Sequence, residues 1–492
     1  MQETKGTIGF NYIMNTIIQG SSYLLSFIVN PYVSAILEPE GMGKISFVTA
    51  IISYFTLLAV LGAPTYGVRE VSKTKTDKRQ LSRTVYEILY INFVMGAFVY
   101  AIYYLYVGLS SQALEYRTLL LVMSPSIVLN VISIDWLYKG LEKFSVIASR
   151  NVMIKIAVVF IIFMCIRDED DIYLYGILTV CATYGVNVWN FLGRKKYIKI
   201  EKKEKLDVKR HILPMFIFFS MTVATTIYTN LDMVMLGILK NDYRAGIYDS
   251  AVKLKGLMVI AVTSLGAVML PRVTALVNQG KINEFKRISE RELNLIIIFS
   301  AAMFFYVEIN ANILIELFSG KEFYDAVPVL RVLAPTVILI GLTNIIGIQM
   351  LIPLGREKIV LLSEIVGALL DLVINFILIP RYDALGAAIG TLIAEIAVLV
   401  VQVVACMDYV FGMFCRIQYY KIFISGIIAG ITSSVINKCI SRAIGKFFLS
   451  GVLFSLLFGM ILLIMKEKEC MHIIKKLKGE ENEDFNSNDS FV

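Results

Sequence analysis

Four basic side chains lie inside segments of the chain that are otherwise apolar: Lys155, Lys253, Lys255 and Arg331. A charged group is expensive inside a membrane-spanning segment, and where one occurs it commonly marks a binding site or a transport path. Together with the acids described below, these residues suggest a pathway for a charged or highly hydroxylated substrate. Lys253 and Lys255 would point roughly 200° apart on a helix, so both cannot face the same cavity. Arg331 lies near the end of its segment, where its long side chain could reach the membrane surface.

Acidic side chains occur in the same kind of segment. Glu364 and Asp371 are seven residues apart, so on a helix they share one face with Asn375. Either carboxylate could bind a cation that is coupled to transport. Acids and bases could also simply neutralise each other, and both interpretations stay open at each site. The other acids in or beside apolar segments are Glu87, Asp135, Asp232, Asp249, Glu308 and Glu395.

Several kinds of chemistry are not indicated by the sequence. The six cysteines are never closer than nine residues apart, so no CxxC metal or redox motif exists. His211 and His472 do not combine with these cysteines at a spacing that suits zinc. The phosphate-binding loop GxxxxGK[ST] is also missing, which argues against ATP hydrolysis by this chain. We therefore expect no metal site, no cofactor and no catalytic residues.

Small polar side chains form stripes along three of the apolar segments. The first stripe consists of Asn11, Asn15, Gln19, Ser22, Ser26 and Asn30; the second of Ser46, Thr49, Ser53 and Thr56; the third of Thr222, Thr225, Thr226, Thr229 and Asn230. Steps of three and four residues keep each stripe on one side of a helix. Polar groups are unfavourable in contact with lipid, so the stripes should face other helices or water. Hydrogen bonding between helices explains any single residue, but a wet central cavity explains all three stripes together.

These residues must be positioned by helices that cross a membrane. The chain has 492 residues, of which 57% are hydrophobic and 17% charged, and its mean hydropathy is +0.71. A soluble domain has about 45–50% apolar and about 25% charged residues, so a water-soluble enzyme is excluded. Because a crossing needs about 20 apolar residues, we predict an all-α polytopic membrane protein. Its fourteen transmembrane helices are predicted at 8–36, 44–67, 84–108, 118–137, 149–166, 172–193, 211–237, 246–271, 292–318, 327–354, 359–380, 386–408, 418–437 and 447–465.

Basic residues are distributed unequally between the two sides of this membrane. With the N-terminus inside, the inner segments carry 33 of the 47 lysines and arginines, the outer loops carry 10, and four lie within helices. Cytoplasmic loops are rich in lysine and arginine, so both termini are predicted to be cytoplasmic. The most basic stretch is 194–210 (RKKYIKIEKKEKLDVKR), which we interpret as a loop that sets topology. Contact with anionic lipids is the alternative interpretation of this stretch.

The two halves of the chain resemble each other. Gly43 recurs at Gly246 and Arg69 recurs at Arg272, and LGA occurs both at 61–63 and at 265–267, all with an offset of 203–204 residues. Six helices precede the second copy, so the halves share one orientation and are related by an axis along the membrane normal. The predicted organisation is a first six-helix lobe at 1–193, a basic cytoplasmic linker at 194–210, a second six-helix lobe at 211–408, helices 13 and 14 within 409–465, and a cytoplasmic tail at 466–492.

Short motifs along nearly the whole chain carry a family resemblance. They are LEPEGMG at 37–43, YGVRE at 66–70, DW at 135–136, GLE at 140–142, NLD at 230–232, MLG at 235–237, GIY at 246–248, LPR at 270–272, GIQ at 347–349, PLGR at 353–356 and LGAA at 385–388. In this order and spacing the chain resembles the Wzx-type oligosaccharide flippases. These belong to the MATE/MOP superfamily, together with multidrug and toxin extrusion antiporters and the lipid II flippase.

The resemblance implies two six-helix lobes around a central cavity that opens alternately to each side. It also implies an oligosaccharide substrate linked to undecaprenyl diphosphate, moved from the inner to the outer leaflet of the bacterial plasma membrane for surface polysaccharide export. On this basis Lys253, Arg69 and Arg272 are expected to bind the diphosphate. The sugar hydroxyls are expected to contact Asn11, Asn15, Gln19 and Asn30. Membrane lipids and a glycan polymerase of the same pathway are expected partners, and nucleic acid is not.

Other functions remain open at this stage. A cation-coupled exporter of drugs or other small molecules could have the same fold, although a more aromatic and acidic cavity without buried lysines would suit it better. A flippase for another polyprenyl-linked glycan such as lipid II is also compatible. A membrane glycan polymerase or ligase would need a large outer loop with catalytic residues, and none of the predicted outer loops exceeds roughly ten residues. A scaffold for a glycan-assembly complex would tolerate the loss of every cavity residue.

Overall fold

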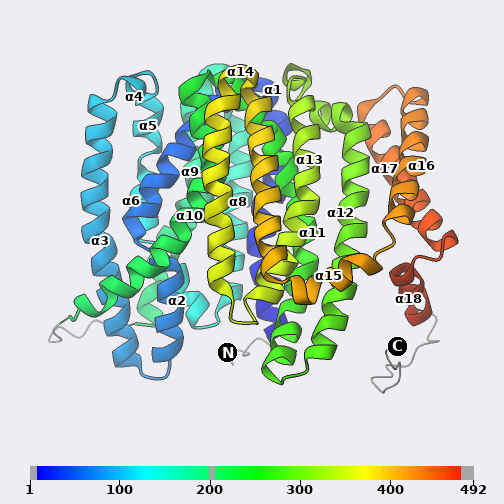
Figure 1. The fold of residues 1–492 in the computed structure, drawn as a ribbon. Coiled ribbons are helices and arrows are strands. Elements are labelled where there is room, and N and C mark those ends of the chain that lie inside the picture. The colour runs from blue at the N-terminus through cyan, green and yellow to red at the C-terminus, as the bar shows by residue number, and fades with distance from the viewer. Residues whose placement is uncertain (1–7, 199–205, 478–492) are drawn as a thin grey trace. The chain divides into compact units, whose positions relative to one another are not determined.

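The computed structural model describes residues 8–198 and 206–477, and every regular element in these ranges is a helix (Figure 1). Contacts group them into two compact units. The first consists of Met1–Leu257, Phe318–Val329 and Glu364–Ala394, and the second of Met258–Leu317, Leu330–Ser363 and Glu395–Val492. The predicted lobes at 1–193 and 211–408 are a different division of the chain and remain a prediction. The end of the predicted tail, 478–492, lies outside the described residues.

The first unit contains most of the N-terminal helices. Its elements are α1 (Ile8–Val60), α2 (Ala63–Thr74), α3 (Lys78–Leu109), α4 (Ser111–Glu115), α5 (Arg117–Met123), α6 (Pro125–Val131), α7 (Asp135–Gly140), α8 (Phe144–Cys165), η1 (Glu169–Asp171), α9 (Ile172–Gly193), η2 (Arg194–Lys196), α10 (Lys209–Leu239) and η3 (Lys321–Phe323). Helix α1 is central, because α3, α6, α8 and α10 all pack against it.

The second unit contains the C-terminal helices. Its elements are most of α12 (Ile282–Phe318), most of α13 (Ala326–Thr343), the π-helix η4 (Asn344–Leu351), α15 (Met407–Arg416), α16 (Tyr419–Cys439), α17 (Ala443–Ile464) and α18 (Lys468–Leu477). Two long helices, α11 (Asp242–Asn278) and α14 (Glu357–Ala405), have parts in both units. Within the second unit α16 packs against α17, and Gly426 lets α16 approach the ring of Phe305 on α12.

The long helices α1 and α14 are each interrupted once. Glu38 (φ 55°) breaks α1 and Asp383 (φ 53°) breaks α14, so each helix corresponds to two predicted crossings. Glu38 precedes Pro39, and the proline ring disfavours the helical conformation of the residue before it. The Asn30-Pro31 pair, which the sequence suggests as a bend, keeps helical backbone angles, so the break lies about two turns further along.

The predicted crossing at 118–137 is not one continuous helix. It is divided among α5, α6 and α7. Pro125 begins α6, because a proline has no backbone N–H to donate and is tolerated in the first turn of a helix. A second interruption follows at 132–134.

Ten helical stretches in the described part of the chain are long and apolar enough to cross a membrane. Two of them, Ser26–Thr74 and Glu357–Ala405, have 49 residues each, which is enough for two crossings at about 20 residues apiece. Large apolar side chains such as Phe160, Phe376 and Phe448 are exposed on these helices, as expected for surfaces that contact lipid. The all-helical polytopic membrane fold is thus confirmed, whereas the count of fourteen helices stays a prediction.

A buried carboxylate holds the start of α10 against α3. Glu87 is fully buried, and its oxygens accept hydrogen bonds from Arg83 (2.9 Å), Arg210 (2.5 Å) and the backbone N–H of Asp207 (2.6 Å). Its second oxygen also lies 2.8 Å from Nε2 of His211. The end of the basic stretch at 194–210 is therefore fixed in the first unit by ion pairs. This is a structural role for Glu87.

Two glycines related by the internal repeat contact each other. A Cβ atom on Gly43 would lie 1.8 Å from the carbonyl oxygen of Asp242, and one on Gly246 would lie 1.9 Å from the carbonyl oxygen of Pro39. Pro39 and Asp242 are themselves 203 residues apart, the same offset as the two glycines. Each half thus makes the same contact with the other, as parts related by a two-fold axis do. The structure therefore supports the repeat that the sequence indicates.

Candidate functional site

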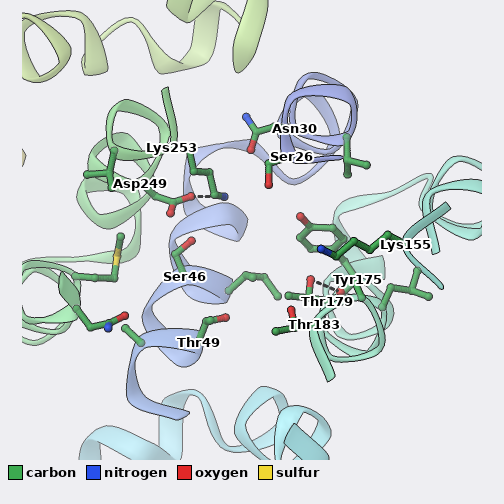
Figure 2. Close-up of a pocket in the computed structure, with 18 of the residues that line it drawn as sticks. Ser26, Asn30, Ser46, Thr49, Lys155, Tyr175, Thr179, Thr183, Asp249 and Lys253 are labelled. Carbon is green, nitrogen blue, oxygen red and sulfur yellow. Dashed lines mark hydrogen bonds and ion pairs between the residues drawn. The ribbon is translucent and has the colours of Figure 1, made fainter. Parts of the chain in front are cut away.

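A polar cavity of about 590 Å³ lies within the first unit (Figure 2). Helices α1, α8, α9, α10 and α11 supply most of its lining. The polar and charged lining residues are Ser26, Asn30, Ser46, Thr49, Asp135, Asn151, Lys155, Tyr175, Thr179, Thr183, Asn187, Thr229, Asn230, Tyr248, Asp249 and Lys253. Hydroxyl and amide groups are the most numerous among them. Such groups can both donate to and accept from a hydroxylated ligand.

The three polar stripes of the sequence meet at this cavity. Ser26 and Asn30 come from the first part of α1, Ser46 and Thr49 from its second part, and Thr229 and Asn230 from α10. Asn30 is buried, and its amide donates to the carbonyl oxygen of Phe318 (2.8 Å) and to the hydroxyl of Ser319 (3.1 Å). The side chain of Asn30 therefore also ties α1 to the segment that follows α12.

Lys253 on α11 lines the cavity and forms an ion pair with Asp249. Its Nζ lies 2.5 Å from a carboxylate oxygen of Asp249, one turn earlier on the same helix. Figure 2 shows both side chains at the cavity wall. Lys255 is not among the residues that line this cavity. The two lysines thus face different surroundings, as their spacing on a helix predicts.

A second lysine, Lys155 on α8, lines the same cavity. Its side chain is buried, and its Nζ donates to the hydroxyl of Ser21 on α1 (3.0 Å). The sequence marks Lys155 as a cation inside an apolar segment, but sequence reasoning did not assign it to the binding site. Asp135, which accepts a hydrogen bond from Asn190 (2.7 Å), is the second acid of the lining. With Asp249 and Lys253, the formal charges of the lining balance.

The other residues predicted to bind substrate are placed as follows. Arg69 is exposed on α2, with its guanidinium carbon 6.0 Å from the centre of the Phe218 ring. Arg272 is exposed on α11 in the second unit. Neither arginine lines the cavity. The side chains of Asn11, Asn15 and Gln19 lie outside the part of the chain that the structure describes.

A buried network around Asp232 forms a second candidate site in the first unit. One carboxylate oxygen of Asp232 accepts from the amide of Asn375 on α14 (2.5 Å). The other accepts from the hydroxyl of Tyr248 and from that of Thr391 (2.9 Å). All four side chains are buried. Asp232 is therefore held by hydrogen bonds from three directions.

Asp371 faces Asp232 in this network. It is 1% exposed and lies close to Asp232 and Asn375. Two carboxylates at close range cannot both stay ionised in an apolar interior unless a cation or a proton is bound between them. Glu364 lies two turns earlier on α14, is only partly buried and is not part of this network. Sequence reasoning thus found Asp371 and Asn375 on one face but not their partner Asp232.

An all-helical membrane fold with a polar cavity and buried charges is the arrangement of a membrane transporter. Residues 8–277 match the model of the polysaccharide biosynthesis protein family, so the chain belongs to that family. A protein of Escherichia coli (strain K12), provisionally described as an O-antigen transporter, is 22% identical over 397 residues, covering 80% of this chain and 95% of that protein.

Two solved structures share the fold. The lipid II flippase MurJ in its inward closed conformation has a TM-score of 0.74 at 14% identity, and the alignment covers 92% of this chain and 98% of that one. An inward-facing multidrug resistance MATE family transporter of the MOP superfamily has a TM-score of 0.61 at 13% identity, covering 84% and 96%. The family match thus confirms the predicted resemblance to proteins of polysaccharide biosynthesis, and the solved structures show that the fold is shared with MurJ and with a MATE family transporter.

Proposed function

We propose that this protein is a flippase that moves a lipid-linked oligosaccharide from the inner to the outer leaflet of the bacterial plasma membrane by alternating access. The observation that carries the proposal is the cavity of the first unit, which places two lysines among hydroxyl and amide groups inside a bundle of apolar helices. A sugar headgroup needs such hydrogen-bonding groups, and a diphosphate needs cations. The family membership and the O-antigen transporter among the relatives support this substrate class.

The cavity residues would act on different parts of the substrate. The sugar would exchange its hydrogen bonds with water for bonds to groups such as Asn30, Asn151 and Thr179. The diphosphate would compete with Asp249 for Lys253, because a phosphate oxygen accepts the same ammonium protons as a carboxylate does. Lys155 is the second cation within the cavity. The polyprenyl tail is apolar and can stay in the bilayer while the headgroup crosses.

Two further sets of residues would serve the transport cycle. Arg69 and Arg272 are repeat-equivalent and exposed, and on the predicted topology they lie at the cytoplasmic side, where they would attract the diphosphate to the mouth of the transporter. Asp371, facing Asp232, would bind the coupling cation or proton, whereas Glu364 is the weaker candidate because it stands outside the network. Both termini would be cytoplasmic, and a glycan polymerase would act on the product.

Reconstitution tests this function directly. Purified protein is placed in liposomes with undecaprenyl diphosphate that carries a fluorescent oligosaccharide, and a membrane-impermeant glycosidase outside reports arrival of the sugar. We expect the accessible fraction to rise with time only in vesicles that contain the protein. Unchanged accessibility, together with altered drug resistance of cells that lack the protein, would instead favour a cation-coupled exporter of the same fold.

Matched lysine variants test whether transport in this assay depends on the cavity. Lys155→Met and Lys253→Met keep the length and the apolar part of the side chain and remove the charge. Lys281→Met is the control. It changes a lysine in the turn between α11 and α12, where the side chain is 53% exposed. Loss of transport in the cavity variants but not in Lys281→Met is expected. Equal activity of all three variants would contradict the cavity as the headgroup site.

A further inference from the structure

Helix α9 supplies an uncharged wall of the cavity. Tyr175, Thr179, Thr183 and Asn187 follow each other along this helix at steps of four residues, and all four line the cavity. Such steps keep side chains on one side of a helix. The charged residues of the lining belong to α7, α8 and α11, whereas α9 contributes no charged residue to the described lining. The α9 wall therefore suits a neutral, hydroxylated group better than it suits a diphosphate.

The part of the α9 wall that a ligand can reach extends from Tyr175 to Thr183. Thr183 is exposed although it lies in the middle of α9, and Tyr175 is partly exposed. Figure 2 shows both side chains at the cavity together with Thr179. Asn187 is buried instead, and its amide donates to the carbonyl oxygen of Leu129 on α6 (3.0 Å). The accessible part measures about 12 Å along the helix axis, at 1.5 Å per residue.

Tyr175 differs from the other aromatic residue that lines the cavity. Tyr248 is 3% exposed, and its hydroxyl donates to the carboxylate of Asp232. Tyr175 packs in part against the apolar cluster that contains Ile45 and Leu119, and within the described part of the chain no other aromatic ring stacks on it. The ring of Tyr175 is thus supported by the core and still accessible from the cavity.

Gly176 sets the direction in which Tyr175 points. A Cβ atom on Gly176 would lie 3.1 Å from the side chain of Leu119 and 3.2 Å from that of Met123, so α9 packs closely on α5 at this turn. Successive residues of a helix are about 100° apart, and Tyr175 is therefore directed away from α5 when Gly176 faces it. A ring held by helix packing has little conformational freedom left to lose when it binds a ligand.

An aromatic ring beside hydroxyl groups matches the chemistry of a sugar. The face of an aromatic ring carries partial negative charge, and a pyranose ring presents C–H groups on its faces and hydroxyls around its rim. A sugar lying flat on Tyr175 would direct its rim hydroxyls to neighbouring groups. Thr179 gives its own hydroxyl proton to the carbonyl oxygen of Tyr175 (2.9 Å), so its oxygen remains as an acceptor. A diphosphate would be repelled by the same ring face.

We propose that α9 is the sugar-binding wall of the cavity and that Tyr175 is the residue on which a sugar ring stacks. This role rests on the proposed function. It places sugar contacts on α9 in addition to Asn30 on α1, and it separates them from the diphosphate contact of Lys253 on α11. Stacking requires a flat face of C–H groups, so a sugar with an axial substituent on that face would bind less well.

Binding to the purified full chain in lipid nanodiscs tests the proposal with two probes. One is undecaprenyl diphosphate alone, and the other is the same lipid carrying the fluorescent oligosaccharide of the flipping assay. The native chain should bind the sugar-bearing probe more tightly than the bare lipid. Tyr175→Leu should reduce this advantage about threefold to tenfold, the size of an aromatic contact, and leave the affinity for the bare lipid unchanged. Tyr175→Phe keeps the ring and should keep most of the advantage.

Two controls and a second variant accompany this measurement. Tyr173→Leu removes a tyrosine of the same helix that is 45% exposed and does not line the cavity, so the advantage should not change. Lys253→Met should weaken both probes by the same factor, since they share the diphosphate. Thr183→Val removes an exposed hydroxyl of the α9 wall at nearly constant shape and should reduce the advantage. It covers the case in which Tyr175→Leu does not fold, because an unchanged advantage would refute the wall.

The outcomes distinguish the sugar wall from the proposed function. If the native chain binds both probes and Tyr175→Leu weakens them equally or not at all, Tyr175 does not hold the sugar, and the flippase function stands. Loss of the whole advantage in Tyr175→Phe would assign the effect to the hydroxyl group and refute stacking. If the native chain binds neither probe, the proposed function is wrong, and so is the role of α9.

Discussion

The hydroxyl oxygens of Ser250 and Ser319 lie 2.6 Å apart in the buried interior of the first unit, although 69 residues separate them in the chain. Ser250 is on α11, and Ser319 directly follows α12. The amide of Asn30 contacts the same serine, so three segments meet at this point. If transport needs these segments to separate, fixing the two serines to each other should stop it.

A disulfide can provide that test. Ser250→Cys with Ser319→Cys, in a chain whose six native cysteines are replaced by serine, should form a cross-link on oxidation, because sulfur atoms at these positions would be close to bonding distance. We expect oxidation to abolish flipping and a reducing agent to restore it. Each single cysteine variant is the control. A cross-linked protein that still flips its substrate would show that the contact does not open.

Gly43 and Gly246 contact each other, although they are far apart in the sequence. Substitutions of these two glycines should therefore have the same effect. A valine at either position would place its Cβ less than 2 Å from a backbone carbonyl oxygen, so the helices must move apart. Overpacking of this kind costs roughly 1–3 kcal/mol or more. Gly43→Val and Gly246→Val should therefore both weaken the Ser250–Ser319 proximity measured by cross-linking. Gly108→Val is the control, because a Cβ atom there meets open space.

The ion pair of Lys253 and Asp249 predicts opposite effects of its two partners on substrate binding. A charged hydrogen bond contributes roughly 1.5–3 kcal/mol, so Lys253→Met should weaken the apparent affinity for the diphosphate lipid about 10- to 100-fold. Asp249→Asn removes the competitor for the lysine and should strengthen that affinity. Concentration dependence of flipping in liposomes measures both. Equal weakening by the two variants would mean that the pair is needed only for folding.

The buried carboxylates predict which acid couples transport to a cation. Asp371→Asn should leave the hydrogen bonds of Asp232 in place but remove the dependence of flipping on an imposed sodium or proton gradient. Glu364→Gln, on the same helix but outside the network, should keep that dependence. The gradient response of reconstituted protein checks this. Retained coupling in Asp371→Asn and lost coupling in Glu364→Gln would move the role to Glu364.

The carboxyl group of Asp242 should make the stability of the folded protein depend on pH. It lies in the first turn of α11, before the predicted crossing, where burial raises the pKa of its carboxyl group and the hydrogen bond from Tyr116 (2.8 Å) partly opposes the rise. A raised folded-state pKa means that the folded protein binds the proton more tightly than the unfolded chain. The associated stability is fully present below the unfolded pKa of about 3.9 and is lost as the pH rises through the folded value.

Asp242→Asn removes this titration while leaving an oxygen for the Tyr116 hydroxyl. The melting temperature of the variant relative to the native chain should therefore increase as the pH is raised from acidic to neutral. Thermal unfolding in detergent across this range measures the difference. Asp170→Asn, which removes a carboxylate at an exposed position, is the control variant.

The sequence predicts the helices well because a membrane crossing needs a long apolar run, which a single chain displays directly. It also marks Lys253 and Asp371, since charge is rare in such runs. The pairing of Asp371 with Asp232 could not be predicted, because periodicity shows which residues share a helix face but not which helix that face meets. Lys155, like Lys253, can be recognised in the sequence as a charge inside an apolar run. A single sequence does not indicate, however, that α8 and α11 line the same cavity.

The bend in α1 shows a second limit of prediction from the sequence. Two prolines, Pro31 and Pro39, lie in this helix, and either could mark its break. The structure bends at the second one, where Glu38 has a left-handed backbone angle. A proline removes one hydrogen bond wherever it stands, but whether the helix then breaks depends on its neighbours. Tertiary packing of this kind is not encoded in local sequence.

The reciprocal contact at Gly43 and Gly246 also bears on the origin of the chain. Two identical six-helix proteins that pair around a two-fold axis would make this same contact twice, once with each partner's equivalent residues. Gene duplication followed by fusion of such a homodimer would produce a single polypeptide with the observed offset of 203 residues. The basic stretch at 194–210 would then be the segment that connects the two copies. The sequences of the two copies could afterwards diverge, and each half could take a separate role. Buried charged side chains occur in both halves: Glu87 and Lys155 in the first, and Asp232 and Asp371 in the second.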